Sequence, residues 1–174
     1  RNWGLGTSST LINNIAQWFQ IDAFELLHQS FGGSGYDIAC AQNNTPITYS
    51  IVNGDPKIEQ VVFDPAFAKN LYFVYLNQKR NSKSAIADYH TNKTKQLSSY
   101  IAAINTLTQD IIEANNLELF TPLISQHETV LSEILKTETV KDTLFPDFDG
   151  AVKSLGAWGG DFVLVVSKEN PKPY

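Results

Sequence analysis

The spacing of apolar residues predicts a group of helices at the start of the chain. Over residues 8–19 the apolar positions recur three or four residues apart, and a similar spacing runs from about residue 22 to residue 30. Such spacing places the apolar side chains on one face of a helix. A glycine-rich turn within residues 31–40 then leads into a further short helix.

The pattern changes to that of strands between residues 47 and 63. Apolar and polar residues alternate over residues 47–51, which predicts a half-buried strand. The pair Asn53-Gly54 favours a tight turn, and residues 58–63 follow as a second strand. Asp64-Pro65 breaks the pattern, so we place a domain boundary after residue 65.

The second half of the chain mixes strands with longer helices. Residues 71–76 form a continuous apolar run, which predicts a strand buried on both faces. Apolar residues at helical spacing predict a long helix from residue 97 to about 115 and another from about 118 to 136. Two further strands, over residues 151–155 and 162–166, enclose a glycine turn. Because strands and helices do not alternate regularly, we expect an α+β fold and not a doubly wound sheet.

Composition narrows the classes of function. The 174 residues are 43% hydrophobic, enough to bury a core. The formal net charge of −5 argues against a nucleic-acid partner. A lone cysteine, Cys40, cannot form an internal disulfide and fits a reducing compartment, so we expect a cytoplasmic protein. We also expect no membrane partner, because the sequence shows neither a signal peptide nor an apolar run of membrane length.

A glycine turn at the start of the chain is the first candidate site. Gly4 and Gly6 can adopt positive φ and let a ligand approach the backbone, and residues 7–10, all Ser or Thr, supply hydroxyl groups and a helix N-cap. The free N–H groups and positive dipole end of such a helix start suit an anion, most often a phosphate. The alternative is an ordinary capped helix start. The segment is not a Walker loop, because no Gly-Lys-Ser/Thr ends it.

The beginning of the chain suggests a further segment. A turn of this type normally follows a strand, and none precedes it here; the chain also contains no methionine. We therefore expect an N-terminal segment of the same protein to complete this domain.

Two later segments are also candidates. In residues 32–37, Gly-Gly-Ser-Gly-Tyr-Asp, Asp37 falls in the first turn of a helix. It can form a capping box with Ser34, or it can act as a carboxylate beside a phosphate-binding turn, accepting a hydroxyl proton. The glycines of residues 156–160 form either a tight hairpin or a turn that lets the backbone approach a ligand closely.

Together, in this order, the three segments resemble the GHMP kinase superfamily. Its phosphate loop is similar to Gly4-Leu-Gly-Thr-Ser-Ser9, and the Ser-Gly-x-Asp of its mevalonate kinase branch is similar to Ser34-Gly-Tyr-Asp37. Residues 33–39 and 153–162 resemble two segments of phosphomevalonate kinases without a gap. Trp158 replaces a family glycine, which puts the contacts of that loop in doubt.

The resemblance implies a two-lobed α+β kinase that uses ATP and Mg²⁺. Residues 1–65 would be the end of a ribosomal-S5-like N-terminal lobe, and residues 66–174 a ferredoxin-like C-terminal lobe. The catalytic residue would be Asp37. The acceptor would be mevalonate or phosphomevalonate. The ATP phosphates would contact Gly4, Leu5, Gly6, Thr7, Ser8 and Ser9. The small-molecule substrate would contact Ser34, Gly35, Ser84, Gly156, Ala157, Gly159 and Gly160.

Several assignments stay open. Magnesium would be held by the Ser8 hydroxyl or by Glu25, although Glu25 can equally be a solvated helix residue. Ser84 lies in a polar loop whose Lys79, Arg80 and Lys83 suit a small anionic ligand, or which is simply solvated.

Two other functions remain possible. Trp158 favours a GHMP-fold protein without catalysis that only binds a small molecule. A sugar or homoserine kinase is disfavoured by Ser34-Gly-Tyr-Asp37. His90 and His127 are expected on polar helix faces, and the sequence around them shows no pattern of catalytic or metal-binding partners; His28 is expected to be structural.

Overall fold

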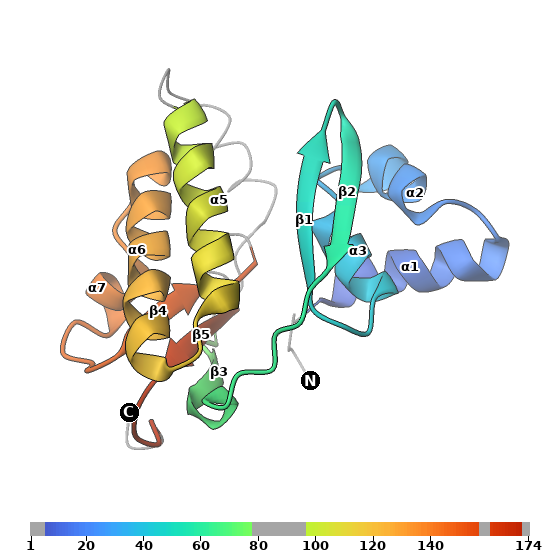
Figure 1. The fold of residues 1–174 in the computed structure, drawn as a ribbon. Helices are drawn as coiled ribbons and strands as arrows, with labels where there is room; N and C mark the ends of the chain where they lie inside the picture. Colours follow the sequence, from blue (N-terminus) through green and yellow to red (C-terminus); the bar gives the residue numbers. More distant parts are fainter. Residues whose placement is uncertain (1–5, 78–96, 157–160, 172–174) are drawn as a thin grey trace. The chain divides into compact units, whose positions relative to one another are not determined.

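The computed structural model describes residues 6–77, 97–156 and 161–171, and the chain divides into two compact units (Figure 1). The first unit is Arg1–Phe63 and the second is Asp64–Tyr174. Leu5, Gly4, Ser84, Ala157, Gly159 and Gly160, which the sequence proposes as site residues, lie outside the described residues. The assignment of the two units to the lobes of a kinase stays a prediction.

The first unit begins with the expected helices. They are α1 (Thr7–Phe19), α2 (Ala23–Ser30) and α3 (Tyr36–Gln42). Their inner faces form a small core of Ile12, Ala16, Ala23 and Ile38, against which Phe24, Leu26 and Leu27 pack. The Asp22 carboxylate caps α2 by accepting a hydrogen bond from the Glu25 N–H at 2.8 Å.

A two-stranded antiparallel hairpin completes this unit. Strand β1 (Ile47–Val52) pairs with β2 (Asp55–Gln60), and the turn at Asn53 and Gly54 has φ of 54° and 94°. The turn is therefore confirmed, but the predicted bounds of the second strand, residues 58–63, are wrong: β2 begins and ends three residues earlier. A two-residue turn leaves Asp55 directly opposite Val52, so pairing starts there and the strand ends at Gln60.

The second unit combines an antiparallel sheet with helices. After a 3₁₀ turn, η1 (Ala68–Asn70), its elements are β3 (Leu71–Tyr75), α5 (Leu97–Glu113), α6 (Leu117–Leu135), α7 (Val140–Leu144), β4 (Ala151–Ser154) and β5 (Phe162–Val166). In the described residues the strand order is β3-β5-β4. Helix α6 packs on β4, and α5 packs on α6 (Figure 1).

The expectation that residues 71–76 form a strand buried on both faces is wrong. Strand β3 lies at an edge of the described sheet, and Phe73 is 65% exposed. The central strand is β5, where Val163 and Val166 are fully buried. A short apolar run shows that a segment is apolar, but it does not show how many of its faces are covered.

Helix α7 was not predicted from the sequence, because it is only one turn of mostly polar residues. Thr139 caps it by accepting from the Asp142 N–H at 3.1 Å, and the Lys141 ammonium donates to the carbonyl of Gly150 at 2.6 Å. The α+β class is confirmed. None of the helices in the described ranges is long and apolar enough to cross a membrane.

Candidate functional site

Helix α1 begins at a glycine in the left-handed conformation. Gly6 is the N-cap, with φ 68° and ψ 14°, which confirms the positive φ predicted for it. No side chain caps the helix, so the predicted Ser or Thr cap is wrong. The hydroxyls of Ser9 and Thr10 instead donate to the Gly6 carbonyl at 3.0 and 2.8 Å. Those two hydroxyls are therefore occupied within the turn itself.

In the described part of the chain, no side-chain cap blocks an anion at the start of α1. The first-turn N–H groups receive no side-chain cap, and Thr7 and Ser8 are exposed while Ser9 is buried. Uncapped N–H groups and the helix dipole both favour negative charge at this end. Of the hydroxyl residues proposed as phosphate ligands, Thr7 and Ser8 are the ones whose side chains remain accessible.

Helix α3 also begins at a left-handed glycine. Its N-cap is Gly35, with φ 87° and ψ 1°, and no side chain caps it. The capping box between Ser34 and Asp37 is therefore not formed. The Tyr49 hydroxyl donates to the Ser34 carbonyl, which ties the turn to β1. Asp37 lies in the first helical turn with its carboxylate free of a capping role.

The local environment raises the pKa of Asp37. Neighbouring protein atoms remove part of the water around the carboxylate and raise its pKa, and a hydrogen bond from the Tyr36 hydroxyl acts in the opposite direction. Burial and the nearby Asp37 charge raise the pKa of Tyr36 to about 12. They also raise the pKa of the Cys40 thiol. A carboxylate with a raised pKa is a stronger base than a fully solvated one.

Gly35 has a packing role of its own. A Cβ built on Gly35 would lie 2.8 Å from Cδ1 of Phe24 and 3.3 Å from the Tyr49 hydroxyl. Because real Cβ atoms do not approach so closely, the turn packs against α2 and β1 only with glycine here. Contact of Gly35 with a substrate stays a prediction.

The third glycine segment joins β4 to β5 in an antiparallel hairpin. Gly156 has φ 67°, the Leu155 N–H donates to the Phe162 carbonyl at 3.3 Å, and the Leu76 N–H donates to the Asp161 carbonyl at 2.9 Å. Both ends of the segment are therefore fixed to the sheet. Trp158, which replaces a family glycine, lies outside the described residues, as do Lys79, Arg80, Lys83 and His90.

Glu25 and His28 lie on exposed positions of α2. Gln29 donates to a Glu25 carboxylate oxygen at 3.1 Å. In the part of the chain that the structure describes, no group of three or more His, Cys, Asp or Glu could hold a metal. Mg²⁺ keeps several waters and binds mainly through substrate phosphates, so it needs no such group. Its ligation by Ser8 or Glu25 stays a prediction.

The expectation that His127 lies on a polar helix face is wrong, because its side chain is only 15% exposed. On α6 the His127 ring nitrogen Nδ1 lies 3.1 Å from the ammonium of Lys153, a β4 residue. The same ammonium donates to the Glu128 carboxylate at 3.2 Å, and the other Glu128 oxygen accepts from the Ser154 N–H at 2.9 Å. The side chains of His127, Glu128 and Lys153 are 15%, 6% and 21% exposed.

Burial sets the protonation of this cluster. Desolvation first, and then the Lys153 charge, lower the pKa of His127 to about 4. The neutral ring can therefore accept from Lys153 at neutral pH. Burial lowers the pKa of Lys153, and the Glu128 carboxylate opposes that shift.

Sequence reasoning did not identify Glu128, although a signal was present. The buried face of α6 carries Leu117, Phe120 and Ile124, and Glu128 occupies the next position on the same face. A charged residue in phase with an apolar stripe is rarely buried without a partner.

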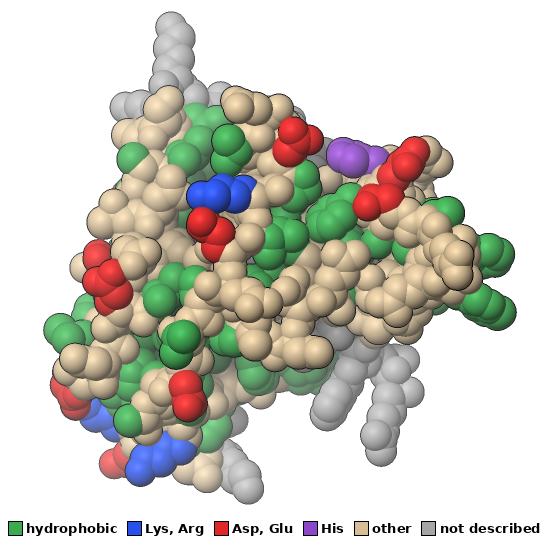
Figure 2. Space-filling view, turned by 45° about the vertical axis from the view of Figure 1, so that its right-hand side comes forward, with side chains coloured by type: hydrophobic (Ala, Val, Ile, Leu, Met, Phe, Trp, Pro, Cys, Tyr) green, Lys and Arg blue, Asp and Glu red, His purple; other side chains and the backbone are tan. Residues whose placement is uncertain are grey.

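One face of the molecule shows how the charges of the described residues are distributed. On the face drawn in Figure 2, acidic and basic side chains are scattered among the described residues.

The solved structures that are similar to the chain include the following two proteins. The Lin0012 protein from Listeria innocua aligns with a TM-score of 0.70 and 18% sequence identity, over 93% of this chain and 58% of its own. The L. major mevalonate kinase, solved in complex with R-mevalonate, aligns with a TM-score of 0.67 and 14% identity, over 99% of this chain and 60% of its own.

No family model matches the sequence, and no curated protein matches it. The chain spans about three-fifths of the length of each of the two solved proteins named above. At these identities the likeness concerns the fold: the chain has an α+β fold of the mevalonate kinase type.

Proposed function

We propose that this chain carries the phosphate-binding and catalytic residues of an ATP-dependent small-molecule kinase. The observation that carries the proposal is the start of α1, where a left-handed Gly6 leaves the first-turn N–H groups without a side-chain cap. An uncapped helix start alone is common. Its occurrence in a fold of the mevalonate kinase type, with a carboxylate at the start of α3, supports phosphoryl transfer.

In this proposal the ATP phosphates bind the turn Gly4–Ser9 through backbone N–H groups. The hydroxyls of Thr7 and Ser8, which are exposed, would contact a phosphate oxygen or the metal. Mg²⁺, when bound, neutralises charge on the phosphates during transfer. Most of the rate then comes from positioning and from stabilising charge, because phosphoryl transfer needs little covalent help from the protein.

Asp37 acts on the acceptor. Asp37 is exposed to solvent, and a carboxylate whose pKa is raised by desolvation from neighbouring atoms can orient an acceptor hydroxyl and remove its proton as the phosphoryl group arrives. If the acceptor group is itself a phosphate, its oxygen is already anionic, and Asp37 matters less as a base. The size of the Asp37 effect therefore distinguishes the two acceptor types.

We propose mevalonate or phosphomevalonate as the acceptor. The support is the similarity of residues 33–39 and 153–162 to phosphomevalonate kinases, together with the solved neighbour that binds R-mevalonate. The positive residues Lys79, Arg80 and Lys83 suit an acceptor that carries a carboxylate or phosphate. Ser34, Gly35, Ser84 and the segment from Gly156 to Gly160 would contact it.

A second candidate function is binding without catalysis. Trp158, where the family has glycine, is the feature that favours it, because a large side chain there narrows the loop.

A coupled ADP-release assay on the full-length protein separates these functions. It is run with mevalonate, phosphomevalonate, galactose and homoserine, each with Mg-ATP. We expect turnover with mevalonate or phosphomevalonate. Turnover with galactose or homoserine alone would overturn the acceptor but keep the kinase. ATP binding without turnover on any of the four would favour the non-catalytic protein.

A further inference from the structure

Helix α1 carries two apolar faces, and the core of the first unit uses one of them. That face packs into the core through Ile12 and Ala16. The other, which we call the second face of α1, consists of apolar residues three or four positions apart, the spacing of one side of a helix. Its residues are Leu11, Ile15, Trp18 and Phe19.

The second face of α1 is largely open to solvent. Leu11 is 57% exposed, Trp18 82% and Phe19 67%, while Ile15 is half-buried. The rings of Trp18 and Phe19 stack on each other with their centroids 5.8 Å apart. A single exposed apolar residue is ordinary, but a row of them that ends in stacked aromatic rings is typical of a surface that a partner covers.

The composition of α1 indicates what kind of partner this is. The helix, Thr7–Phe19, contains no Asp, Glu, Lys or Arg. Charged residues are depleted at the centres of protein interfaces and are common on helix faces that water covers. A helix without Lys or Arg is also poorly suited to an anionic membrane, which interfacial helices hold through basic residues. These features favour a polypeptide that covers the second face permanently.

The core of the first unit is small for the size of the unit. Its buried hydrophobic side chains, among the described residues, are those of two isoleucines and three alanines: Ile12, Ala16, Ala23, Ile38 and Ala39. Its sheet has two described strands, and a two-stranded hairpin adds little stability by itself. Because small units bury too little surface to be stable alone, covering the second face of α1 would supply burial that this unit needs.

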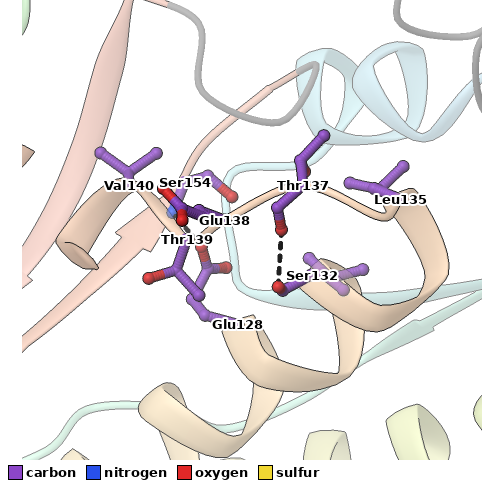
Figure 3. Close-up of a pocket in the computed structure, with 9 residues that line it drawn as sticks. Glu128, Ser132, Leu135, Thr137, Glu138, Thr139, Val140 and Ser154 are labelled. Atoms are coloured by element: carbon purple, nitrogen blue, oxygen red, sulfur yellow. Dashed lines mark hydrogen bonds between the residues drawn. The ribbon is translucent and has the colours of Figure 1, made fainter. Parts of the chain in front are cut away.

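The second unit of the same chain is packed differently. Large apolar side chains fill its core, among them Phe120, Ile124 and Val163. Even a carboxylate is satisfied there, since Glu128 of α6 accepts from the Ser154 N–H at 2.9 Å, and Figure 3 shows Glu128 beside Ser154 in the wall of a small pocket. The exposed aromatic rings of α1 therefore contrast with the packing elsewhere in the described chain.

The lengths of the solved neighbours indicate where a covering polypeptide would come from. Both neighbours align over nearly the whole of this chain, yet about two-fifths of each has no counterpart in it. A part of this size, in the same protein, is large enough to cover one face of a helix. Because a glycine turn like the one before α1 normally follows a strand, we expect that part on the N-terminal side of the turn.

We propose that the second face of α1 is the docking surface for an N-terminal segment of the same protein, which packs apolar side chains against Trp18 and Phe19. The proposal gives this segment a defined place on the first unit. It does not depend on phosphoryl transfer, so it stands or fails independently of the proposed function.

Photo-cross-linking in the full-length protein tests the identity of the partner. p-Benzoylphenylalanine is placed at position 18 in one variant and at position 17 in the control, because Gln17 is exposed on the same helix but points about 100° away from Trp18. Mass spectrometry identifies the linked peptide. We expect position 18 to link to a peptide that precedes Arg1, and position 17 to lose that link. A link from position 18 to residues 64–174, to a second copy or to no protein would overturn the proposal.

Thermal unfolding of the full-length protein tests whether the face is covered. Trp18→Asp and Gln17→Asp introduce the same residue at neighbouring positions of one helix. We expect Trp18→Asp to lower the melting temperature by about 5 °C or more, because it removes a buried apolar side chain and buries a charge, and Gln17→Asp to lower it by about 2 °C or less. Equal small shifts would show that Trp18 stays in water and would overturn the proposal. If Trp18→Asp does not fold, Trp18→Ala and Gln17→Ala carry the same comparison without a buried charge.

Discussion

A Cβ added to Gly35 would meet the ring of Phe24, and the φ of 87° at Gly35 is one that residues with side chains rarely adopt. Gly35→Ala therefore suffers both backbone strain and a steric clash. Gly32→Ala is the matched control, because Gly32 also has positive φ but nothing lies within 4 Å of its added Cβ. The two variants separate conformational strain from packing at this turn.

We expect Gly32→Ala to lower the free energy of unfolding by about 1 kcal/mol and Gly35→Ala by about 2 kcal/mol more. Urea unfolding of both variants measures the difference. Equal losses would show that Phe24 moves aside at little cost and that Gly35 is not needed for packing.

His127 makes stability depend on pH in a defined direction. Its pKa is about 4 in the folded protein, below the ordinary value of 6.5, so the unfolded chain takes up the proton first as pH falls. The neutral ring contributes its full stability above about pH 6.5, and this contribution is lost as pH falls towards 4. A shift of this size corresponds to about 3 kcal/mol.

We expect the free energy of unfolding, measured in urea, to fall between pH 6.5 and pH 4.5 more steeply for the wild type than for His127→Gln. Titrating carboxylates affect both proteins alike, so the difference between the two curves reports His127. Parallel curves would contradict the depressed pKa.

At the scale of single elements, the start of α1 carries the nucleotide prediction. Gly6→Val places a β-branched side chain on a φ of 68° at the point where phosphate would approach. We expect the variant to remain folded and to lose Mg-ATP binding, measured by calorimetry on the full-length protein. Gly54→Val introduces comparable strain in the β1–β2 turn, at φ 94°, and should leave ATP binding intact. Equal ATP affinity in folded Gly6→Val would refute the phosphate site.

The helices could be predicted from the sequence because each has a face of apolar residues at helical spacing. The predicted start of strand β2 was three residues too late, because the first half of the strand, Asp55–Lys57, has no apolar alternation. Only the two-residue turn indicates that pairing starts at Asp55. Helix α7 escaped prediction because a single capped turn has no periodicity to detect. Neither error concerns the three glycine segments.

Within the candidate site, glycine spacing predicted the positive φ at Gly6, but not the chemistry around it. The hydroxyls of Ser9 and Thr10 turn back to the Gly6 carbonyl, and the capping box at Ser34 does not form. The ion pair of Glu128 and Lys153 joins residues far apart in sequence, so no local pattern could pair them.

For the molecule as a whole, fold and function rest on different observations. Similarity to a mevalonate kinase at 14% identity shows the fold, and the proposed activity depends on the residues at the starts of α1 and α3. Asp37, at the start of α3, is the residue through which the proposed activity can be tested within this fold. Its carboxylate does not cap its helix, and the melting temperature measured beside kcat separates a loss of catalysis from a loss of stability.

The most direct test is the kcat of Asp37→Asn with the acceptor that wild type turns over best, measured together with the melting temperature. Asn has the same size but cannot act as a base. With a hydroxyl acceptor we predict a fall in kcat of about 100-fold or more, with little change in melting temperature. A folded Asp37→Asn protein that turns over mevalonate at the wild-type rate would contradict the account.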